Sequence, residues 1–300
     1  MTIGLALSAG AARGFAHIGV LYALEQARIP IHQIAGASFG ALIGASYASG
    51  ISAEELIERA TSNEIKRLGV LLSLTVQRTG LVRESRISRF IRLFLDKDDF
   101  EELLIPVTIV ATRVDTGEEI HLSSGDLYKA IRASIAFPVA ITPVRHNGYY
   151  LMDGGLVNPV PVNALSTDIK IACNVLPHPK SKKRIQRIVI SDVSLHSRLR
   201  RLKKYLCESI KETFIDRFIN LKIAVTSPML ANLFVHREVV IENTIINLHY
   251  KLTPPDFVIN PKVEHIGQTQ FYRAKEAIKA GWEAAQPVIS EIKKLLCEKV

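Results

Sequence analysis

The chain has 300 residues, of which 48% are hydrophobic and 22% charged. These proportions exclude an intrinsically disordered protein and are typical of a globular one. Lys and Arg outnumber Asp and Glu by 38 to 29, a formal net charge of +9, yet residues 180–217 alone hold 12 basic and 4 acidic side chains. The positive charge therefore belongs to one internal segment rather than to a nucleic-acid-binding tail.

In chain order, the first part of the sequence alternates strands with helices. The apolar segment Ile3–Leu7 predicts a strand, and the small residues 8–14 after it predict a loop. A helix is expected over Phe15–Ala27, a second strand over Ile31–Ala35 and a second helix over Ala41–Ser49. This alternation favours an α/β fold with a parallel sheet covered by helices.

The alternation continues along the rest of the chain. Helices are expected over Leu127–Ser134 and Phe271–Cys297, the second with a bend at Pro287. Further strands are expected over Pro106–Thr112, Tyr149–Met152, Ile169–Val175 and Phe257–Ile259.

The basic segment predicts a long amphipathic helix. Leu, Ile and Phe recur every three or four residues over 195–218, with Arg and Lys on the other faces. We place this helix in an insertion, 193–250, within one domain spanning 1–300. The helix could pack on its own sheet or dock on an anionic membrane. Binding to nucleic acid is not expected, because no reader motif or interleaved aromatic residue accompanies the charge.

The cysteines give no sign of a disulfide framework. Cys173, Cys207 and Cys297 are widely spaced and form no CxxC or Cys/His cluster, which also argues against a zinc site. The first residues lack the basic region of a signal peptide, and no apolar stretch has the pattern of a membrane span. We therefore expect a cytoplasmic protein with reduced thiols.

A G-x-S-x-G pentapeptide, Gly36–Gly40, lies between a predicted strand and a predicted helix. This setting is typical of a nucleophile elbow, in which a sharp turn directs the hydroxyl of Ser38 out of the sheet. The alternative interpretation is a tight turn that only packs the helix against the sheet.

A loop of small residues, Ala9–Gly14, follows the first strand. Its backbone N–H groups could cradle a phosphate or form an oxyanion hole for acyl transfer, or the loop could be a compact connection. The spacing of Gly10 and Gly14 fits neither the P-loop nor the dinucleotide-binding motif, although Arg13 adds a positive charge.

Asp153-Gly154-Gly155 follows a short predicted strand and could supply a general base, although Asp-Gly-Gly also makes ordinary turns. A Ser-His-Asp triad would need a histidine late in the chain, and His249 and His265 are the candidates. His17 is expected to be structural. A serine activated directly by the carboxylate is the simpler interpretation.

Four blocks of sequence occur in a distinctive order: Leu7–Leu21, Gly36–Gly40, Ser134–Pro138 and Asp153–Pro161. Together they resemble the patatin-like phospholipase family, in the bacterial branch that is similar to the catalytic domain of neuropathy target esterase. The resemblance spans residues 3 to about 163. It implies a three-layer α/β fold with a mostly parallel central sheet, to which the charge and periodicity of this sequence add a helical, basic C-terminal insertion.

The resemblance also implies a Ser–Asp dyad, with Ser38 as nucleophile and Asp153 as base. It maps the oxyanion hole to the N–H groups of Gly10 and Ala11 together with Arg13, which matches the basic residue of the family's glycine motif. Alanine replaces glycine at two positions of that motif, Ala9 and Ala11, which is harmless if neither requires a positive φ. The supporting motif residues are Gly14, Gly36, Gly40, Gly154 and Gly155.

These features predict a serine acyl-ester hydrolase that acts on lysophospholipids or related fatty-acyl esters, without a metal or an organic cofactor. If the helix over 195–218 docks on a membrane rather than packing on the core, it would place this cytoplasmic enzyme on the inner face of the cell membrane. Two alternatives stay open. One is a regulatory or scaffold protein with a weak or inactive site. The other is a nucleotide-binding module that uses the loop Ala9–Gly14, which we call the glycine loop. The sequence leaves the oligomeric state undefined.

Overall fold

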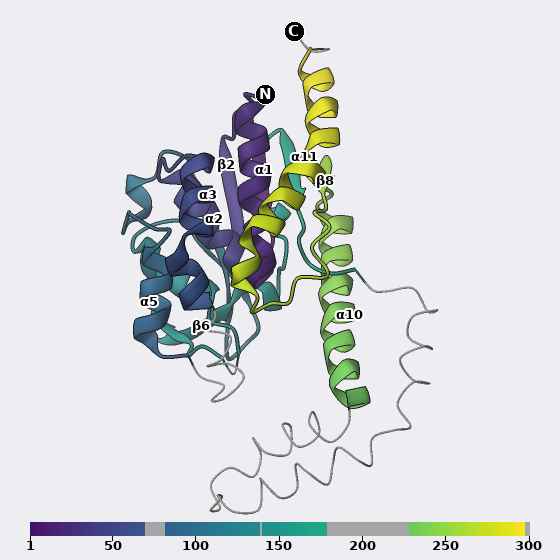
Figure 1. Ribbon diagram of the computed structural model, residues 1–300. Coiled ribbons are helices and arrows are strands. Elements are labelled where there is room, and N and C mark those ends of the chain that lie inside the picture. The colour runs from purple at the N-terminus through teal and green to yellow at the C-terminus, as the bar shows by residue number, and fades with distance from the viewer. Residues whose placement is uncertain (70–81, 139, 179–227, 298–300) are drawn as a thin grey trace, which may run out of the picture. The chain divides into compact units, whose positions relative to one another are not determined.

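The computed structural model describes residues 1–69, 82–138, 140–178 and 228–297 (Figure 1). The predicted basic helix, 195–218, and most of the predicted insertion lie outside these residues. The chain divides into two compact units, one made of Met1–Pro177 with Thr244–Val300 and the other of His178–Asn243. In the second unit, the Asn243 amide donates a hydrogen bond to the Val239 carbonyl at 2.7 Å.

The first unit contains an eight-stranded sheet that is mostly parallel, as predicted. The order is β5-β6-β3-β2-β1-β7-β8, with β4 paired to β3. The strands from β3 to β8 along this order run parallel, while β4, β5 and β6 join by antiparallel pairs. The bounds are β1 Ile3–Leu7, β2 Gln33–Ala37, β3 Val107–Arg113, β4 Glu119–Leu122, β5 Val144–His146, β6 Tyr149–Asp153, β7 Ile169–Cys173 and β8 Phe257–Ile259.

The predicted helices that lie within the described residues are present, together with elements that were not predicted. The α-helices are α1 Phe15–Gln26, α2 Phe39–Ala48, α3 Ala53–Thr61, α5 Glu84–Arg92, α6 Leu127–Ser134, α10 Pro228–Leu252 and α11 Ala274–Cys297. Helices α3 and α5 and strands β4 and β5 were not predicted, and β2 lies two residues later than predicted. None of the described helices is long and apolar enough to cross a membrane.

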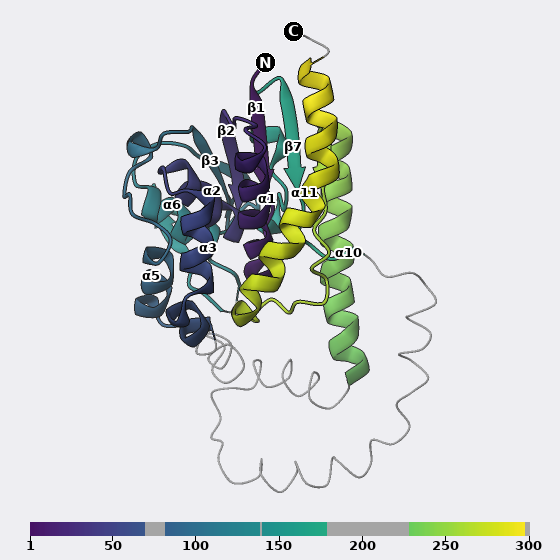
Figure 2. The ribbon, with the colours of Figure 1, turned by 45° about the horizontal axis from the view of Figure 1, so that its top comes forward.

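The alternation of side chains along β1 divides the interior into two cores. Ile3, Leu5 and Leu7 lie in the larger one, to which α1, α2, α3 and α11 also contribute (Figure 2). Ala6 faces the other way, into a smaller cluster that includes residues of the 160–165 segment and Ile246 of α10. Both faces of the sheet are thus covered, as a parallel sheet requires.

Helices α1 and α11 cross in close contact. A Cβ atom added at Gly19 of α1 would lie 1.9 Å from the Ile278 carbonyl oxygen, and one added at Gly281 of α11 would lie 1.9 Å from that of Ala16. Only glycine permits this approach of the two backbones. Pro287 lies inside α11, and the helix changes direction along its length (Figure 1).

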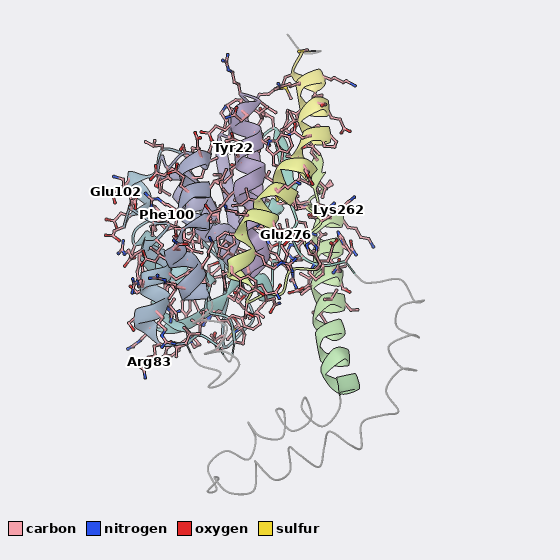
Figure 3. The ribbon with its side chains drawn as sticks, in the orientation of Figure 1. Tyr22, Arg83, Phe100, Glu102, Lys262 and Glu276 are labelled. Carbon is pink, nitrogen blue, oxygen red and sulfur yellow. The ribbon has the colours of Figure 1, made fainter. Side chains whose placement is uncertain are left out.

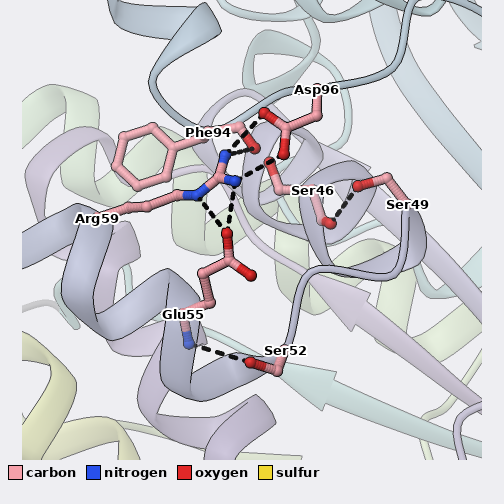
Figure 4. A network of polar contacts seen from close by, with 7 residues as sticks. All are labelled: Ser46, Ser49, Ser52, Glu55, Arg59, Phe94 and Asp96. Atoms are coloured by element: carbon pink, nitrogen blue, oxygen red, sulfur yellow. Dashed lines mark hydrogen bonds and ion pairs between the residues drawn. The ribbon is translucent and has the colours of Figure 1, made fainter.

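A network of ion pairs and hydrogen bonds connects α3 to the segment that follows α5 (Figure 4). The Arg59 guanidinium lies 2.6 Å from carboxylate oxygens of both Glu55 and Asp96, and it also donates to the Phe94 carbonyl. The Asp96 side chain is half-exposed. The guanidinium holds the pKa of Asp96 below its usual value of 3.8 through its hydrogen bond and its charge.

Candidate active site

Ser38 lies in the turn between β2 and α2, with φ at 53° and ψ at −122°. A positive φ is unfavourable for a side-chain-bearing residue, so the turn holds Ser38 in a strained conformation. A Cβ atom at Gly36 would lie 2.5 Å from the Ala41 Cα, and one at Gly40 would lie 2.4 Å from the Leu7 carbonyl oxygen. Glycine at both positions lets α2 pack directly against the strands, as the elbow motif predicted.

Asp153 is the last residue of β6, and its side chain meets that of Ser38. The Ser38 hydroxyl donates a hydrogen bond to Asp153 Oδ2 at 2.7 Å, across 115 residues of sequence. The other carboxylate oxygen, Oδ1, accepts from the Gly155 N–H at 2.8 Å. The two residues that the sequence proposed as a dyad are therefore in direct contact.

Burial makes the Asp153 carboxylate more basic. Asp153 is only 4% exposed, and loss of hydration raises the pKa of its carboxyl group from 3.8 to about 6. The hydrogen bonds from the Ser38 hydroxyl and the Gly155 N–H act in the opposite direction. A carboxylate with a pKa near 6 is ionised at neutral pH and is a stronger base than an ordinary aspartate.

Three further residues hold the ends of the strands and helices around the dyad, and the sequence analysis gave none of them a role. The buried Ser134 hydroxyl accepts from the Ser38 N–H at 2.8 Å. The Thr112 hydroxyl donates to the Asp153 carbonyl oxygen at 2.7 Å, and the Ala136 carbonyl accepts from the Asp153 N–H at 3.1 Å. Ser134 and Ala136 belong to the sequence block Ser134–Pro138, which was the only sequence signal that pointed to them.

The loop Ala9–Gly14 reaches the dyad through Gly155. A Cβ atom at Gly155 would lie 2.8 Å from the Ala9 Cβ, so the two segments are in contact. The Ala9 and Ala12 N–H groups donate to the carbonyls of Pro159 and Gln268. Those of Gly10 and Ala11, the pair predicted to form the oxyanion hole, have no acceptor among the described residues.

Ala11 adopts a positive φ of 48°. Alanine in place of the family's glycine is therefore unfavourable at this position. A left-handed conformation costs an alanine about 1–2 kcal/mol, but the N–H group is retained. Arg13 donates from Nε to the Ile266 carbonyl at 2.7 Å and so ties the loop to the segment before α11. A Cβ atom at Gly14 would lie 2.4 Å from the Phe39 ring.

Gly154 also lies where the backbone is crowded. A Cβ atom there would be 2.1 Å from the Val110 carbonyl oxygen in β3. Gly154–Leu156 forms a one-turn 3-10 helix packed against the sheet, and the Asp153 carboxylate caps it by accepting from the Gly155 N–H.

His17 has a structural position, as expected. Its ring is completely buried, with Nε2 2.8 Å from the Ser8 carbonyl oxygen and Nδ1 3.1 Å from Cys173 Sγ. A carbonyl oxygen only accepts hydrogen bonds, so Nε2 carries the proton and Nδ1 accepts from the thiol. Burial lowers the pKa of His17 to about 4, so the ring is neutral at physiological pH.

The late histidines do not intervene between Ser38 and Asp153. The Ser38 hydroxyl has one proton and gives it directly to the carboxylate. His265 instead contacts Glu276, which lies near the start of α11 (labelled in Figure 3) and also pairs with Arg273. Within the described part of the chain, no three His, Cys, Asp or Glu side chains are grouped to hold a metal ion.

Comparison with known proteins adds independent information. The model of the patatin-like phospholipase family matches residues 5–166. An NTE family protein of Mycobacterium tuberculosis is 36% identical over 176 residues, which are 58% of this chain and 49% of that protein. The mouse patatin-like phospholipase domain-containing protein 6 is 37% identical over 168 residues, or 54% of this chain and 12% of that protein.

The crystal structure of VipD from Legionella pneumophila is similar with a TM-score of 0.48 and 12% identity, covering 97% of this chain and 66% of that one. This chain spans about half the length of the mycobacterial relative and a much smaller share of the mouse protein. The family match covers the segment that carries Ser38, Asp153 and the glycine loop. By its sequence and its mostly parallel sheet flanked by helices, the chain belongs to the patatin-like phospholipase family.

Proposed function

We propose that this protein is a serine acyl-ester hydrolase acting on lipid esters, with Ser38 as the nucleophile and Asp153 as the general base. The observation that carries the proposal is the 2.7 Å hydrogen bond from the Ser38 hydroxyl to a buried carboxylate. Membership of a phospholipase family supports an ester as the substrate.

The first half of the reaction forms an acyl-enzyme. The Asp153 carboxylate takes the hydroxyl proton of Ser38 while Oγ attacks the ester carbonyl carbon. The carbonyl oxygen gains the electron pair, and the N–H groups of Gly10 and Ala11, which have no acceptor among the described residues, stabilise its charge. When this intermediate collapses, the alcohol leaves with the proton held by Asp153, and the acyl group stays on Ser38.

The second half releases the fatty acid. Asp153 takes a proton from a water molecule, which attacks the acyl carbonyl carbon, and the same N–H groups stabilise the second oxyanion. Collapse breaks the bond to Ser38 Oγ, which recovers the proton from Asp153. The cycle consumes one ester and one water and yields one fatty acid and one alcohol. In this mechanism Arg13 positions the glycine loop through its hydrogen bond to the Ile266 carbonyl.

Lysophospholipids and related fatty-acyl esters are the proposed substrates. Phe137 and Leu156 are each 39% exposed, and each is next in sequence to a residue that hydrogen-bonds Asp153. Large apolar side chains exposed beside the dyad favour an acyl chain over a polar substrate. We further propose that the basic segment over 195–218 brings the enzyme to an anionic membrane surface.

Covalent labelling tests the proposal. A fluorophosphonate probe should form one adduct on the intact protein, mapped to Ser38 by peptide mass spectrometry. Ser38→Ala should remove both the adduct and ester hydrolysis. The control is Ser49→Ala, because Ser49 ends the same helix and its hydroxyl contacts only helix backbone among the described residues; it should label as the wild type does.

Two results would overturn this function. Wild-type protein that stays unlabelled but gains thermal stability with a nucleotide would be a nucleotide-binding module. Protein that neither reacts nor hydrolyses esters would be a scaffold with an inactive site.

A further inference from the structure

The end of helix α6 lies against both members of the dyad. Ser134 is the last residue of α6, and its hydroxyl is completely buried. We propose that Ser134 is a positioning residue that holds the backbone of Ser38 in its strained conformation. The inference rests on the proposed function, and it gives a role to the Ser134–Pro138 block that the mechanism leaves unused.

The hydrogen bonds of Ser134 define this role. Its Oγ accepts from the Ser38 N–H at 2.8 Å and donates to the Val110 carbonyl oxygen at 2.6 Å. The single hydroxyl proton is committed to Val110, so a lone pair is directed to Ser38. Ser134 thereby joins the nucleophile turn to strand β3, across 96 residues of sequence.

This contact matters because a strained backbone persists only where several surrounding contacts hold it. The φ of 53° at Ser38 is unfavourable for any residue with a side chain. The hydrogen bond that the Ser38 N–H donates to Ser134 Oγ fixes the peptide immediately before the Ser38 Cα, and with it the direction of the Cα–Cβ bond. Without it, Oγ is free to move relative to Asp153, and a displacement of about 1 Å can lower a rate about 100-fold.

The same end of α6 also fixes the second member of the dyad. Two residues beyond Ser134, the Ala136 carbonyl accepts from the Asp153 N–H at 3.1 Å. One short segment therefore contacts the backbone of the nucleophile through a side chain and the backbone of the base through a carbonyl. The separation of Ser38 and Asp153 depends on this segment as well as on their own strands.

The test compares Ser134→Ala with a matched control, Ser46→Ala. Ser46 is equally buried, lies in α2 and donates one hydrogen bond to the Leu42 carbonyl at 2.7 Å. Each variant loses one buried hydroxyl. We expect Ser134→Ala to lower kcat for a soluble p-nitrophenyl ester by about 10- to 100-fold with KM within about twofold of the wild type. Ser46→Ala should keep kcat.

A second variant and a measurement that does not depend on activity separate the role of Ser134 from an effect on folding. Ser134→Cys keeps the shape of the side chain but is a much weaker acceptor, so it should also lower kcat. The amide hydrogen of Ser38, followed by NMR, should exchange at least about tenfold faster in the Ser134 variants and at the wild-type rate in Ser46→Ala.

Unchanged kcat and unchanged Ser38 exchange in both Ser134 variants would overturn the inference. An equal fall of kcat in Ser46→Ala would also overturn it, because the loss would then follow general destabilisation. If Ser38→Ala still hydrolyses esters, the proposed function fails, while the exchange rate still decides whether Ser134 holds Ser38.

Discussion

Two aspartates of this protein differ in what surrounds them. Asp96 lies at the surface beside the Arg59 guanidinium, and its pKa is held below the usual value (Figure 4). Asp153 is buried with a hydroxyl and a backbone N–H as its partners, and its pKa is raised to about 6. The same side chain is a weak base in the first setting and a useful one in the second.

The difference shows what a buried carboxylate needs in order to take a proton near neutral pH. A cation beside Asp153 would stabilise the ionised form and remove its basicity, as Arg59 does for Asp96. Neutral donors instead keep the carboxylate in place and compensate only part of the lost hydration. Each prediction below compares the two sites.

Replacing each aspartate by asparagine should affect turnover very differently at the two sites, and this is the largest difference we expect between them. Asp153→Asn removes the proposed base and should lower kcat by about 10²- to 10⁴-fold. Asp96→Asn should leave kcat within about twofold, because its contacts are with Arg59 and not with the dyad. Steady-state hydrolysis of a soluble ester measures both. A comparable loss in the two variants would refute the assignment of Asp153 as the base.

The pH dependence of kcat/KM should report the raised pKa of Asp153. The base acts when ionised, so kcat/KM should fall about tenfold for each pH unit below about 6 and level off above it. Asp96→Asn should give the same profile, since Asp96 is already ionised over this range. An inflection near pH 4 in the wild type would contradict the effect of burial on Asp153.

The raised pKa also has a consequence for folding stability. A group whose pKa is higher in the folded state contributes stability below its unfolded pKa of 3.8, and that contribution is lost as pH rises through about 6. The stability of Asp153→Asn relative to the wild type should therefore improve by about 2–3 kcal/mol between pH 4 and pH 7. Urea unfolding of both proteins at pH 4 and pH 7 measures this change. If the difference in unfolding free energy between them were the same at both pH values, the raised pKa of Asp153 would be refuted.

The smallest effect is expected at the surface site. Asp96→Asn should lower the free energy of unfolding at pH 7 by less than about 1 kcal/mol, because the pair is partly exposed and Arg59 keeps Glu55 as a partner. The loss should shrink in 1 M NaCl, where exposed charges are screened. Urea titrations at low and high salt provide the measurement. A larger loss of unfolding free energy that does not change with salt would show that packing, rather than charge, accounts for the contribution of Asp96.

The sequence predicted most of the sheet because apolar strands and small-residue turns are local signals. Ile3–Leu7 and Phe257–Ile259 form strands with the predicted bounds. β2 runs two residues further than predicted, into the elbow, because pairing with β1 and β3 extends it to Ala37. The missed helix α5 is rich in charged residues and shows only three buried positions, so its apolar signal is weak.

The site was predictable to the extent that it is written in contiguous motifs. Ser38, Asp153 and the glycine loop each stand in a short pattern with glycine neighbours. The contacts of Ser134 and Thr112 could not be read in this way, because their partners are strands or turns distant in sequence. Nor could that of Arg13, whose acceptor, Ile266, is 253 residues away.

The close crossing of α1 and α11 has a consequence for the order in which the molecule can be completed. The glycine loop lies near the start of the chain, but its Ala12 N–H is held by the Gln268 carbonyl and its Arg13 side chain by the Ile266 carbonyl, and the helix that follows it packs on Gly281. During synthesis, residues 1–20 therefore emerge long before the partners that fix them. The proposed catalytic loop should be among the last parts to reach its final geometry, so ribosome-bound chains that end before α11 should carry an unfinished site.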